Sequence, residues 1–345
     1  PKLTTPDSPE LFGLISEMRT SGLKALSMEV SSHSIAQKRI SGIHFSIGIF
    51  TCIGRDHLEF HKTQEEYERV KMSFFTEILP GSKKLLGAVI NGDDDLGRRI
   101  AGGVNYRKLT FSMQKGAADV FPLRSRFGIG GIDAAIRTPA GDIEIRSELT
   151  GRFNLMNLMS AAAAGILAGM EPRAVREGLE SVKEIPGRLQ RVRNEKGVNV
   201  FVDYSHTPRA IENVLASLRP VTEGRLIFIG GAGGDRDPGK RPLMGIAAYK
   251  GSDLAIITSD NPRSEDPEKI ISQIVQGILK EKEKGPDRLY CVEPDRRKAI
   301  QKGLEIAGAG DTVVICGKGH ECYQILKDRT IRFSDVETAR EILNG

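Results

Sequence analysis

Short apolar runs alternate with amphipathic stretches along the second half of the chain. Apolar runs bounded by turn residues are typical of buried strands, and apolar positions at helical spacing are typical of helices that cover a sheet. The pattern predicts strands at 198–203, 225–229, 254–258, 289–292 and 312–316, and helices at 208–218, 243–249, 267–280 and 296–307. This alternation favours a mostly parallel, doubly wound, Rossmann-like domain with helices on both faces.

The pattern in the first half is less regular. It predicts helices at 8–21, 63–79, 94–101 and 154–170, and strands at 25–30, 45–51 and 87–91. Between 108 and 148 it changes to short alternating segments broken by Gly and Pro, which indicates a β-rich insert. The tripeptide Ile185-Pro186-Gly187 is typical of a hinge. We therefore expect an α/β chain of two domains, 1–187 and 188–345, the first a parallel-sheet domain that carries the insert.

Composition and charge narrow the functional class. With 39% hydrophobic and 28% charged residues, the 345-residue chain has the composition of a globular protein. A net charge of +5 is too small to predict a nucleic-acid partner, and it suits small anionic substrates better. No apolar run is long enough to span a bilayer. We expect a cytoplasmic protein without a membrane or nucleic-acid partner.

The segment 259–267, Ser-Asp-Asn-Pro-Arg-Ser-Glu-Asp-Pro, follows an expected strand and precedes an expected helix. Open α/β sheets bind ligands at the carboxyl ends of their strands. Asp260 can accept from an ammonium group, Asn261 can donate and accept, and Arg263 can hold a carboxylate with two hydrogen bonds. The segment predicts a site for a zwitterionic amino acid, and an ordinary strand-to-helix turn is the alternative.

A second group of polar residues lies in the first half. Glu29 ends one expected strand, His57 follows the next, and Lys71 lies on the helix after it. A carboxylate and an imidazole at adjacent strand ends can hold a divalent cation that binds phosphates. The alternatives are a histidine satisfied within the fold and an exposed lysine paired with Glu68 along its helix.

Two glycine-rich loops resemble nucleotide-binding motifs. The segment 234–241 has the spacing of a P-loop but ends in Arg241, where a hydroxyl must bind magnesium. The segment 230–234 resembles a dinucleotide loop, but the third glycine of that fingerprint falls on Arg236. A nicotinamide-dependent oxidoreductase therefore remains only as an alternative reading.

Ten strings carry a more specific resemblance: EVSSH, SIAQKR, RDHLEFH, EEYERVK, GRFNLMN, GRLQRV, VDYSHTP, GGDRDPGKRPLM, DNPRSEDP and GKGHE. In order and spacing they resemble the Mur ligase family, and within it the members that add the third residue of the peptidoglycan stem peptide. The resemblance covers essentially the whole chain. It also implies that the P-loop of the family, GTxGKTT, and a uridine-binding domain would lie upstream of Pro1. A chain beginning at Pro1 is therefore expected not to turn over ATP alone.

The resemblance implies an ATP-dependent ligase that joins UDP-N-acetylmuramoyl-L-alanyl-D-glutamate to an amino acid through an acyl phosphate. The partners are then that nucleotide, ATP and the amino acid, with Mg²⁺ as cofactor. We expect meso-diaminopimelate, because Arg263 and Glu321 present a cation and an anion to its distal end. The alternatives are a lysine-adding ligase and a non-catalytic fragment that binds only the amino acid.

The resemblance also implies individual roles. The UDP-muramoyl substrate would contact Thr4, Thr5, Ser31, Gln37 and Arg39. Magnesium would be bound by Glu29 and His57, with Lys71 carbamylated beside a second ion. ATP would contact Asn91, Arg188, Asp203 and His206, with Lys240 at the γ-phosphate. The catalytic residues would be Lys71, His57 and Lys240. The incoming amino acid would contact Arg236, Asp260, Asn261, Pro262, Arg263, Gly317 and Glu321.

Overall fold

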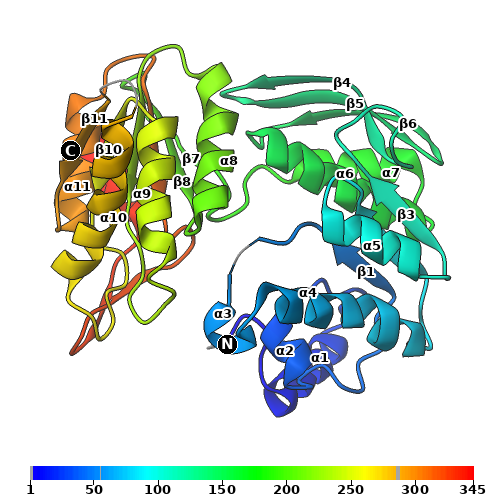
Figure 1. Ribbon diagram of the computed structural model, residues 1–345. Coiled ribbons are helices and arrows are strands. Elements are labelled where there is room, and N and C mark those ends of the chain that lie inside the picture. The colour runs from blue at the N-terminus through cyan, green and yellow to red at the C-terminus, as the bar shows by residue number, and fades with distance from the viewer. Residues whose placement is uncertain (1–2, 55, 285–287) are drawn as a thin grey trace. The chain divides into compact units, whose positions relative to one another are not determined.

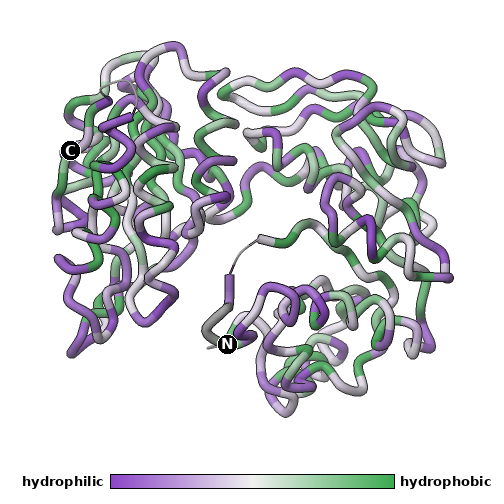
Figure 2. The backbone as a smooth tube through the Cα atoms, in the orientation of Figure 1, coloured by the Kyte–Doolittle hydropathy of each residue, from purple (hydrophilic) through white to green (hydrophobic). Residues whose placement is uncertain are grey.

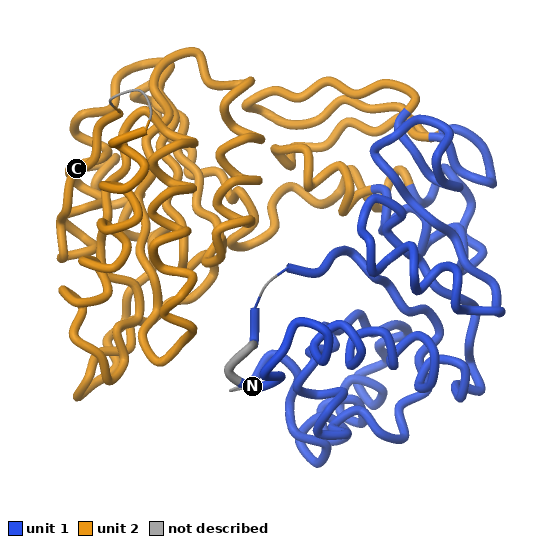
Figure 3. Tube along the Cα trace, viewed as in Figure 1, with its two compact units in different colours: residues 1–122, 137–142, 159–175 blue, residues 123–136, 143–158, 176–345 orange. Residues whose placement is uncertain are grey.

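A computed structural model describes residues 3–54, 56–284 and 288–345. The chain divides into two compact units (Figure 3). The first comprises residues 1–122, 137–142 and 159–175, and the second comprises 123–136, 143–158 and 176–345. The domain boundary expected after residue 187 stays a prediction. No helix in the described ranges is long and apolar enough to cross a membrane.

The second unit is built on a six-stranded sheet of order β11-β10-β9-β12-β8-β7. Figure 1 labels β7, β8, β10 and β11 of this sheet. Its strands are β7 (Gln190–Val192), β8 (Asn199–Asp203), β9 (Leu226–Gly230), β10 (Leu254–Ile257), β11 (Leu289–Val292) and β12 (Thr312–Cys316). All pairs are parallel except β7 with β8. The five strands predicted from the apolar runs are confirmed. The short β7 is an addition, because three residues carry too little periodicity to be recognised.

Helices cover both faces of this sheet, as the pattern predicted. On one face α8 (Pro208–Leu218), α9 (Lys240–Gly251) and α10 (Pro267–Lys282) bury apolar residues against Phe201, Phe228 and Val314. On the other, α11 (Arg296–Ile306) and α12 (Asp335–Asn344) pack against Val200 and its neighbours. Hydrophobic and hydrophilic residues alternate along these helices (Figure 2), as expected when only one side of a helix packs against a sheet. The doubly wound fold is confirmed.

The first unit holds a parallel sheet of order β1-β2-β3, formed by β1 (Ile47–Phe50), β2 (Gly87–Asn91) and β3 (Lys108–Phe111). Its helices are α1 (Ser8–Thr20), α2 (Ser32–Ala36), α3 (Leu58–His61), α4 (Gln64–Ser73) and α5 (Asp95–Gly103). A π-helical turn (Phe74–Ile78) and a 3₁₀ turn (Leu79–Gly81) continue α4. The strand expected at 25–30 is wrong: the segment is largely exposed and has no ladder. Apolar alternation makes a strand only where a neighbour takes its backbone hydrogen bonds.

The β-rich insert is confirmed for residues 121–147, which form a three-stranded sheet of order β4-β5-β6. Its expected start at 108 is wrong, because β3 pairs with β2 in the parallel sheet. Its strands are β4 (Phe121–Gly128), β5 (Gly131–Thr138) and β6 (Gly141–Ser147), and they are followed by α6 (Arg152–Leu167) and α7 (Pro172–Ser181). Near the carboxyl terminus β13 (Tyr323–Ile325) and β14 (Thr330–Arg332) form an antiparallel hairpin. The apolar pattern did not predict α2, α3, α7, α12 or this hairpin, which lie outside its regular alternation.

Candidate active site

The predicted residues of the second unit gather at one edge of its sheet. Strands β8, β9, β10 and β12 end in register, with Cys316 paired to Asp203 and Ile257 to Gly230. The loops that follow therefore leave from the same edge. They carry Arg236, the segment 260–263 and the segment 317–321. This is the edge at which open parallel sheets bind ligands.

The segment after β10 has an unusual backbone at Arg263, whose φ is +52°. Such a conformation costs a non-glycine residue about 1 kcal/mol or more, and residues that adopt it are enriched at functional sites. Here the backbone N–H of Arg263 donates to Ile325 O (3.1 Å), and its Nη1 donates to Gly234 O (2.8 Å). A carboxylate can still take the Nε and Nη2 donors. The half-buried guanidinium is thus fixed in place with donors left for a ligand.

The loop after β9 is braced against the same segment. Gly234 donates its N–H to Asn261 O (2.9 Å), and a Cβ at Gly234 would lie 1.9 Å from Pro262 O. Buried Arg241 donates from Nη1 to Glu265 Oε2 (2.8 Å) and from Nη2 to Glu265 Oε1 (2.7 Å). This bidentate bridge holds the pKa of Glu265 below its ordinary value. It ties the exposed Arg236 loop to the Arg263 loop.

The loop after β12 carries Glu321 and a lysine that the sequence analysis did not single out. Lys318 is fully buried, and its Nζ donates to Asn261 Oδ1 (3.0 Å) and to Glu321 Oε2 (3.3 Å). Asn261 in turn donates from Nδ2 to Glu321 Oε2 (2.8 Å). The amide of Asn261, expected at the amino acid, is therefore engaged within the protein. Gly317 has φ +115°, and a Cβ there would lie 2.2 Å from Asp260 Oδ2.

A buried ion pair lies beneath these loops. The guanidinium of Arg296 donates from Nε and Nη2 to the Asp335 carboxylate, both at 2.7 Å, and both side chains are 0% exposed. Arg296 Nη2 also donates to Cys316 O (2.9 Å), and Nη1 donates to Ser259 O (3.3 Å). One side chain therefore joins the ends of β12 and β10 to the start of α12. The sequence does not reveal this role of Arg296, because a linear pattern does not distinguish a buried arginine from a solvated one.

Three of the residues predicted at ATP, Arg188, Asp203 and His206, lie next to Tyr204 in the sequence or in the fold. Arg188 has its guanidinium carbon 5.7 Å from the centre of the Tyr204 ring, and the His206 ring lies 4.8 Å from it. Burial and the carboxylates of Glu321 and Asp260 raise the pKa of Tyr204 to about 12. Asp203 is buried, and its carboxylate accepts from Leu189 N (2.8 Å) and Ser205 N (2.9 Å). Lys240 is buried in the first turn of α9.

In the first unit, the residues expected at the UDP-muramoyl substrate form a connected group. Thr5 Oγ1 donates to Glu29 O (2.8 Å) and accepts from Ser31 N (3.1 Å). The hydroxyl of Ser31 caps α2 by accepting from Ser34 N (3.1 Å). Arg39 donates from Nη1 to Thr5 O (3.1 Å) and from Nη2 to the Gln37 amide oxygen. The capped turn thus brings these residues together, while the side chain of Thr4 is exposed.

Lys71 lies close to Glu29, and its Nζ donates to Val30 O (3.2 Å). Burial lowers the pKa of Lys71, and the Glu29 carboxylate partly opposes this effect. His57 has φ +59°, and its ring lies 5.0 Å from that of His33 and 5.8 Å from that of Tyr67. Among the described residues, no group of three or more His, Cys, Asp or Glu side chains is placed so that it could hold a metal ion.

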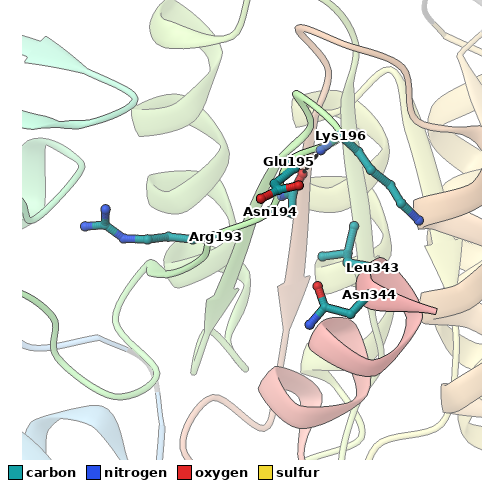
Figure 4. A pocket seen from close by; sticks show the side chains of 6 residues that line it. All are labelled: Arg193, Asn194, Glu195, Lys196, Leu343 and Asn344. Atoms are coloured by element: carbon teal, nitrogen blue, oxygen red, sulfur yellow. Dashed lines mark hydrogen bonds between the residues drawn. The ribbon is translucent and has the colours of Figure 1, made fainter.

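Asn91 ends β2 and is buried. Its Nδ2 donates to Thr51 O (2.5 Å), and its Oδ1 accepts from Asp93 N (2.9 Å). The amide therefore bridges the end of β1 to the turn after β2. Elsewhere, a surface depression lined by Arg193, Asn194, Glu195, Lys196, Leu343 and Asn344 lies between the β7–β8 turn and α12 (Figure 4). None of the predicted site residues lines it.

Comparison with known proteins identifies the class. The model of the Mur ligase middle domain matches residues 1–165, and that of the Mur ligase glutamate ligase domain matches residues 187–319. A protein of Geobacter metallireducens is 41% identical over 346 residues, covering 97% of this chain and 68% of the relative. A protein of Gloeobacter violaceus is 42% identical over 343 residues, covering 99% of this chain and 68% of the relative. The chain belongs to the Mur ligase family.

Both relatives are named UDP-N-acetylmuramoyl-L-alanyl-D-glutamate--2,6-diaminopimelate ligase, and the chain spans about two thirds of their length. A solved structure of a protein with that name is 34% identical, with a TM-score of 0.65, covering 99% of this chain and 69% of the other. A solved structure of folylpolyglutamate synthase from Mycobacterium tuberculosis is 19% identical, with a TM-score of 0.63. The match covers 87% of this chain and 64% of the other, and it shows a shared fold alone.

Proposed function

We propose that this protein is an ATP-dependent ligase that joins meso-diaminopimelate to UDP-N-acetylmuramoyl-L-alanyl-D-glutamate. The observation that carries the proposal is the meeting of Arg263 and Glu321 at one sheet edge. Burial and the negative charge of Glu321 raise the pKa of Tyr323, while the positive charge of Arg263 opposes that shift. The charges of Arg263 and Glu321 therefore both lie close enough to Tyr323 to affect its pKa. The distal end of diaminopimelate carries one carboxylate and one ammonium group. It can pair with Arg263 and Glu321 at once.

The remaining amino-acid contacts follow from the same edge. Arg236 is exposed beside the Arg263 loop and can hold a second carboxylate. Asp260, packed on Gly317, can accept from an ammonium group. Pro262 shapes the turn, and Asn261 fixes Glu321. We assign these residues to the incoming amino acid, with Asn261 acting mainly through Glu321.

We assign Thr4, Thr5, Ser31, Gln37 and Arg39 of the first unit to the UDP-muramoyl substrate. Their hydroxyl, amide and guanidinium groups suit its phosphates and peptide. Glu29 and His57 would hold Mg²⁺: the exposed Glu29 carboxylate supplies the oxygen ligand that this cation prefers, and the half-exposed His57 imidazole would supply a nitrogen ligand beside it. When bound, the ion supplies positive charge at the phosphates of ATP.

Lys71 fits this site in one chemical form. A protonated lysine would repel the cation, whereas a carbamate on Nζ carries negative charge and attracts it. Only the neutral amine reacts with carbon dioxide, and the lowered pKa of Lys71 makes that form more accessible than in an exposed lysine. We therefore propose that Lys71 is carbamylated in the active protein.

In the first unit we assign Asn91 to ATP. In the second unit we assign Arg188, Asp203 and His206 to ATP, with Lys240 directed to the γ-phosphate. The D-glutamyl carboxylate takes that phosphoryl group and releases ADP. The amino group of diaminopimelate then attacks the acyl phosphate, and the tetrahedral intermediate expels phosphate to leave the amide. The protein must orient both reactants and exclude water from the acyl phosphate. Because the reaction consumes ATP and a nucleotide-linked precursor, we place it in the cytoplasm.

Titration calorimetry of the 345-residue chain tests the amino-acid assignment without requiring turnover. Meso-diaminopimelate should bind at the second unit, and L-lysine should bind at least about 30-fold more weakly, because it leaves Arg263 without its carboxylate. Tighter binding of lysine would favour the lysine-adding alternative. Absence of binding by either amino acid would contradict the assignment.

A further inference from the structure

We propose that Lys318 is a positioning residue that sets amino-acid specificity, by fixing Glu321 and by balancing its charge. The proposal rests on the assignment of this edge to diaminopimelate. It concerns a residue that contacts Glu321, which is assigned to the distal end of the ligand, and Asn261, which fixes Glu321, and that does not itself reach the surface.

The hydrogen bonds around Lys318 fix the orientation of the Asn261 side-chain amide. An ammonium has donors only, so the amide atom of Asn261 that faces it must be the oxygen. The backbone N–H of Ile325 donates to the same Oδ1 at 2.9 Å, which agrees with that orientation. Nδ2 of Asn261 is then directed to Glu321 Oε2. Lys318 therefore fixes Asn261, and both residues fix Glu321.

Only one oxygen of Glu321 is left for a ligand. Oε2 accepts from Asn261 Nδ2 (2.8 Å) and from Lys318 Nζ (3.3 Å). Oε1 has the hydroxyl of Tyr323 at 3.5 Å, on the exposed side of the loop. The Glu321 side chain is 14% exposed, so its rotamer is confined while Oε1 faces outward. A ligand ammonium can bind there without displacing an internal hydrogen bond.

Charge balance gives Lys318 its effect on specificity. Its positive charge offsets the negative charge of Glu321, while Arg263 and Asp260 carry opposite charges, and the pair of Arg296 and Asp335 is neutral as a unit. The distal end of diaminopimelate has no net charge, whereas that of lysine is a cation. Lys318 therefore disfavours the cationic ligand relative to the zwitterionic one. Removing its charge should make the site more favourable to lysine relative to diaminopimelate.

Stability alone is a weak explanation for this lysine. Enclosing an ammonium costs free energy, and buried ion pairs are often replaced by apolar residues without loss of stability. The lysine also lies 5.6 Å from the centre of the Tyr323 ring, so it is packed beneath the candidate site rather than in the apolar core. Its neighbours are Asn261 and Glu321, and the orientation of Glu321 would determine how the ligand binds.

The test uses calorimetric titration of meso-diaminopimelate and of L-lysine into the unsubstituted chain and three variants: Lys318→Met, Glu321→Gln and the double variant. Lys318→Met should weaken diaminopimelate binding at least about 30-fold, because a partner of a buried charge pair is lost. The ratio of the two dissociation constants should also move toward lysine by about 10-fold, as expected for a unit charge several ångströms away in a partly screened site.

The double variant separates positioning from packing. If Lys318 acts through Glu321, then Lys318→Met should change diaminopimelate affinity less than about 3-fold once Glu321→Gln is present. Lys318→Gln is a second neutral variant that keeps a donor for Asn261, and it should move the ratio in the same direction. Lys108→Met is the control, since Lys108 is a partly buried lysine of the first unit that donates to Val104 O (3.0 Å). It should leave both affinities unchanged.

The outcomes distinguish this inference from the proposed function. If the unsubstituted chain binds neither amino acid, the proposed function and the inference both fail. If it binds diaminopimelate but the ratio stays constant in Lys318→Met and Lys318→Gln, the inference alone is overturned. Equal weakening of both ligands, or failure of both neutral variants to fold, would assign Lys318 a purely structural role and would also overturn it.

Discussion

The ion pair of Arg296 and Asp335 permits a stability prediction that can be worked out from its contacts. Both side chains are 0% exposed, and two hydrogen bonds of 2.7 Å join them. Arg296→Met would leave the Asp335 carboxylate enclosed without its cation. It would also remove the donors to Cys316 O (2.9 Å) and Ser259 O (3.3 Å).

Removing one partner of such a pair costs about 3 to 5 kcal/mol, because the remaining charge stays buried. At about 2 to 4 °C per kcal/mol for a unit of this size, the melting temperature should fall by roughly 6 to 20 °C. The double variant Arg296→Met/Asp335→Leu removes both charges. Both variants leave the Cys316 and Ser259 carbonyls without these donors, about 1 to 3 kcal/mol each when fully buried, so that cost does not separate them. Because the double variant leaves no unpaired buried charge, it should be more stable than Arg296→Met alone.

Differential scanning calorimetry of the four proteins in this cycle measures the effect. Arg297→Met is a matched control on the same helix, because Arg297 pairs with Glu341 at 2.8 Å while both side chains are more than half exposed. It should cost no more than about 1 kcal/mol. The reasoning is refuted if the double variant is as unstable as the sum of the single variants, or if Arg296→Met is no worse than the control.

Three further predictions concern the site itself. Lys71→Ala should abolish ligase turnover in the product of the complete gene, and added short carboxylates should restore part of it, since they replace the carbamate; a fully active variant would contradict carbamylation. Arg263→Ala should lower kcat/KM for diaminopimelate by roughly 30-fold or more and change that for lysine far less, so an unchanged ratio would contradict the pocket. Gly234→Ala should weaken diaminopimelate binding at least about 10-fold, because its Cβ would meet Pro262 O at 1.9 Å, whereas Gly102→Ala, which has open space, should not; equal affinities in calorimetry would count against this close approach.

Much of the fold could be predicted because its strands are buried on both faces. Strands β8, β9, β10 and β12 are buried apolar runs separated by amphipathic helices, so the linear pattern predicts their order and type. The edge strand β11 is more exposed but is also an apolar run. The segment 25–30 has similar apolar residues but no ladder, and pairing depends on a neighbour that the pattern does not reveal. The hairpin of β13 and β14 was missed because its three-residue strands are too short for periodicity.

The candidate site was predictable where residues follow strand ends, as for Asp260 and Arg263. The buried cations beneath the site, Arg296 and Lys318, could not be predicted. Arg296 and its partner Asp335 are 39 residues apart, and Lys318 lies 57 residues from Asn261, so nothing local distinguishes them from solvated charges. Their burial depends on tertiary packing. The positive φ of Arg263 and of His57 likewise becomes visible only in the folded backbone.

The central claim is tested most directly by ligation with the product of the complete gene. UDP-N-acetylmuramoyl-L-alanyl-D-glutamate, ATP and Mg²⁺ are incubated with either meso-diaminopimelate or L-lysine, and the nucleotide product is identified by mass spectrometry while ADP release is followed. The account predicts a product heavier by one diaminopimelate residue, formed with one ADP per amide bond and at least about 30-fold higher kcat/KM than with lysine. Preferential addition of lysine, or no amide product with either amino acid, would contradict it.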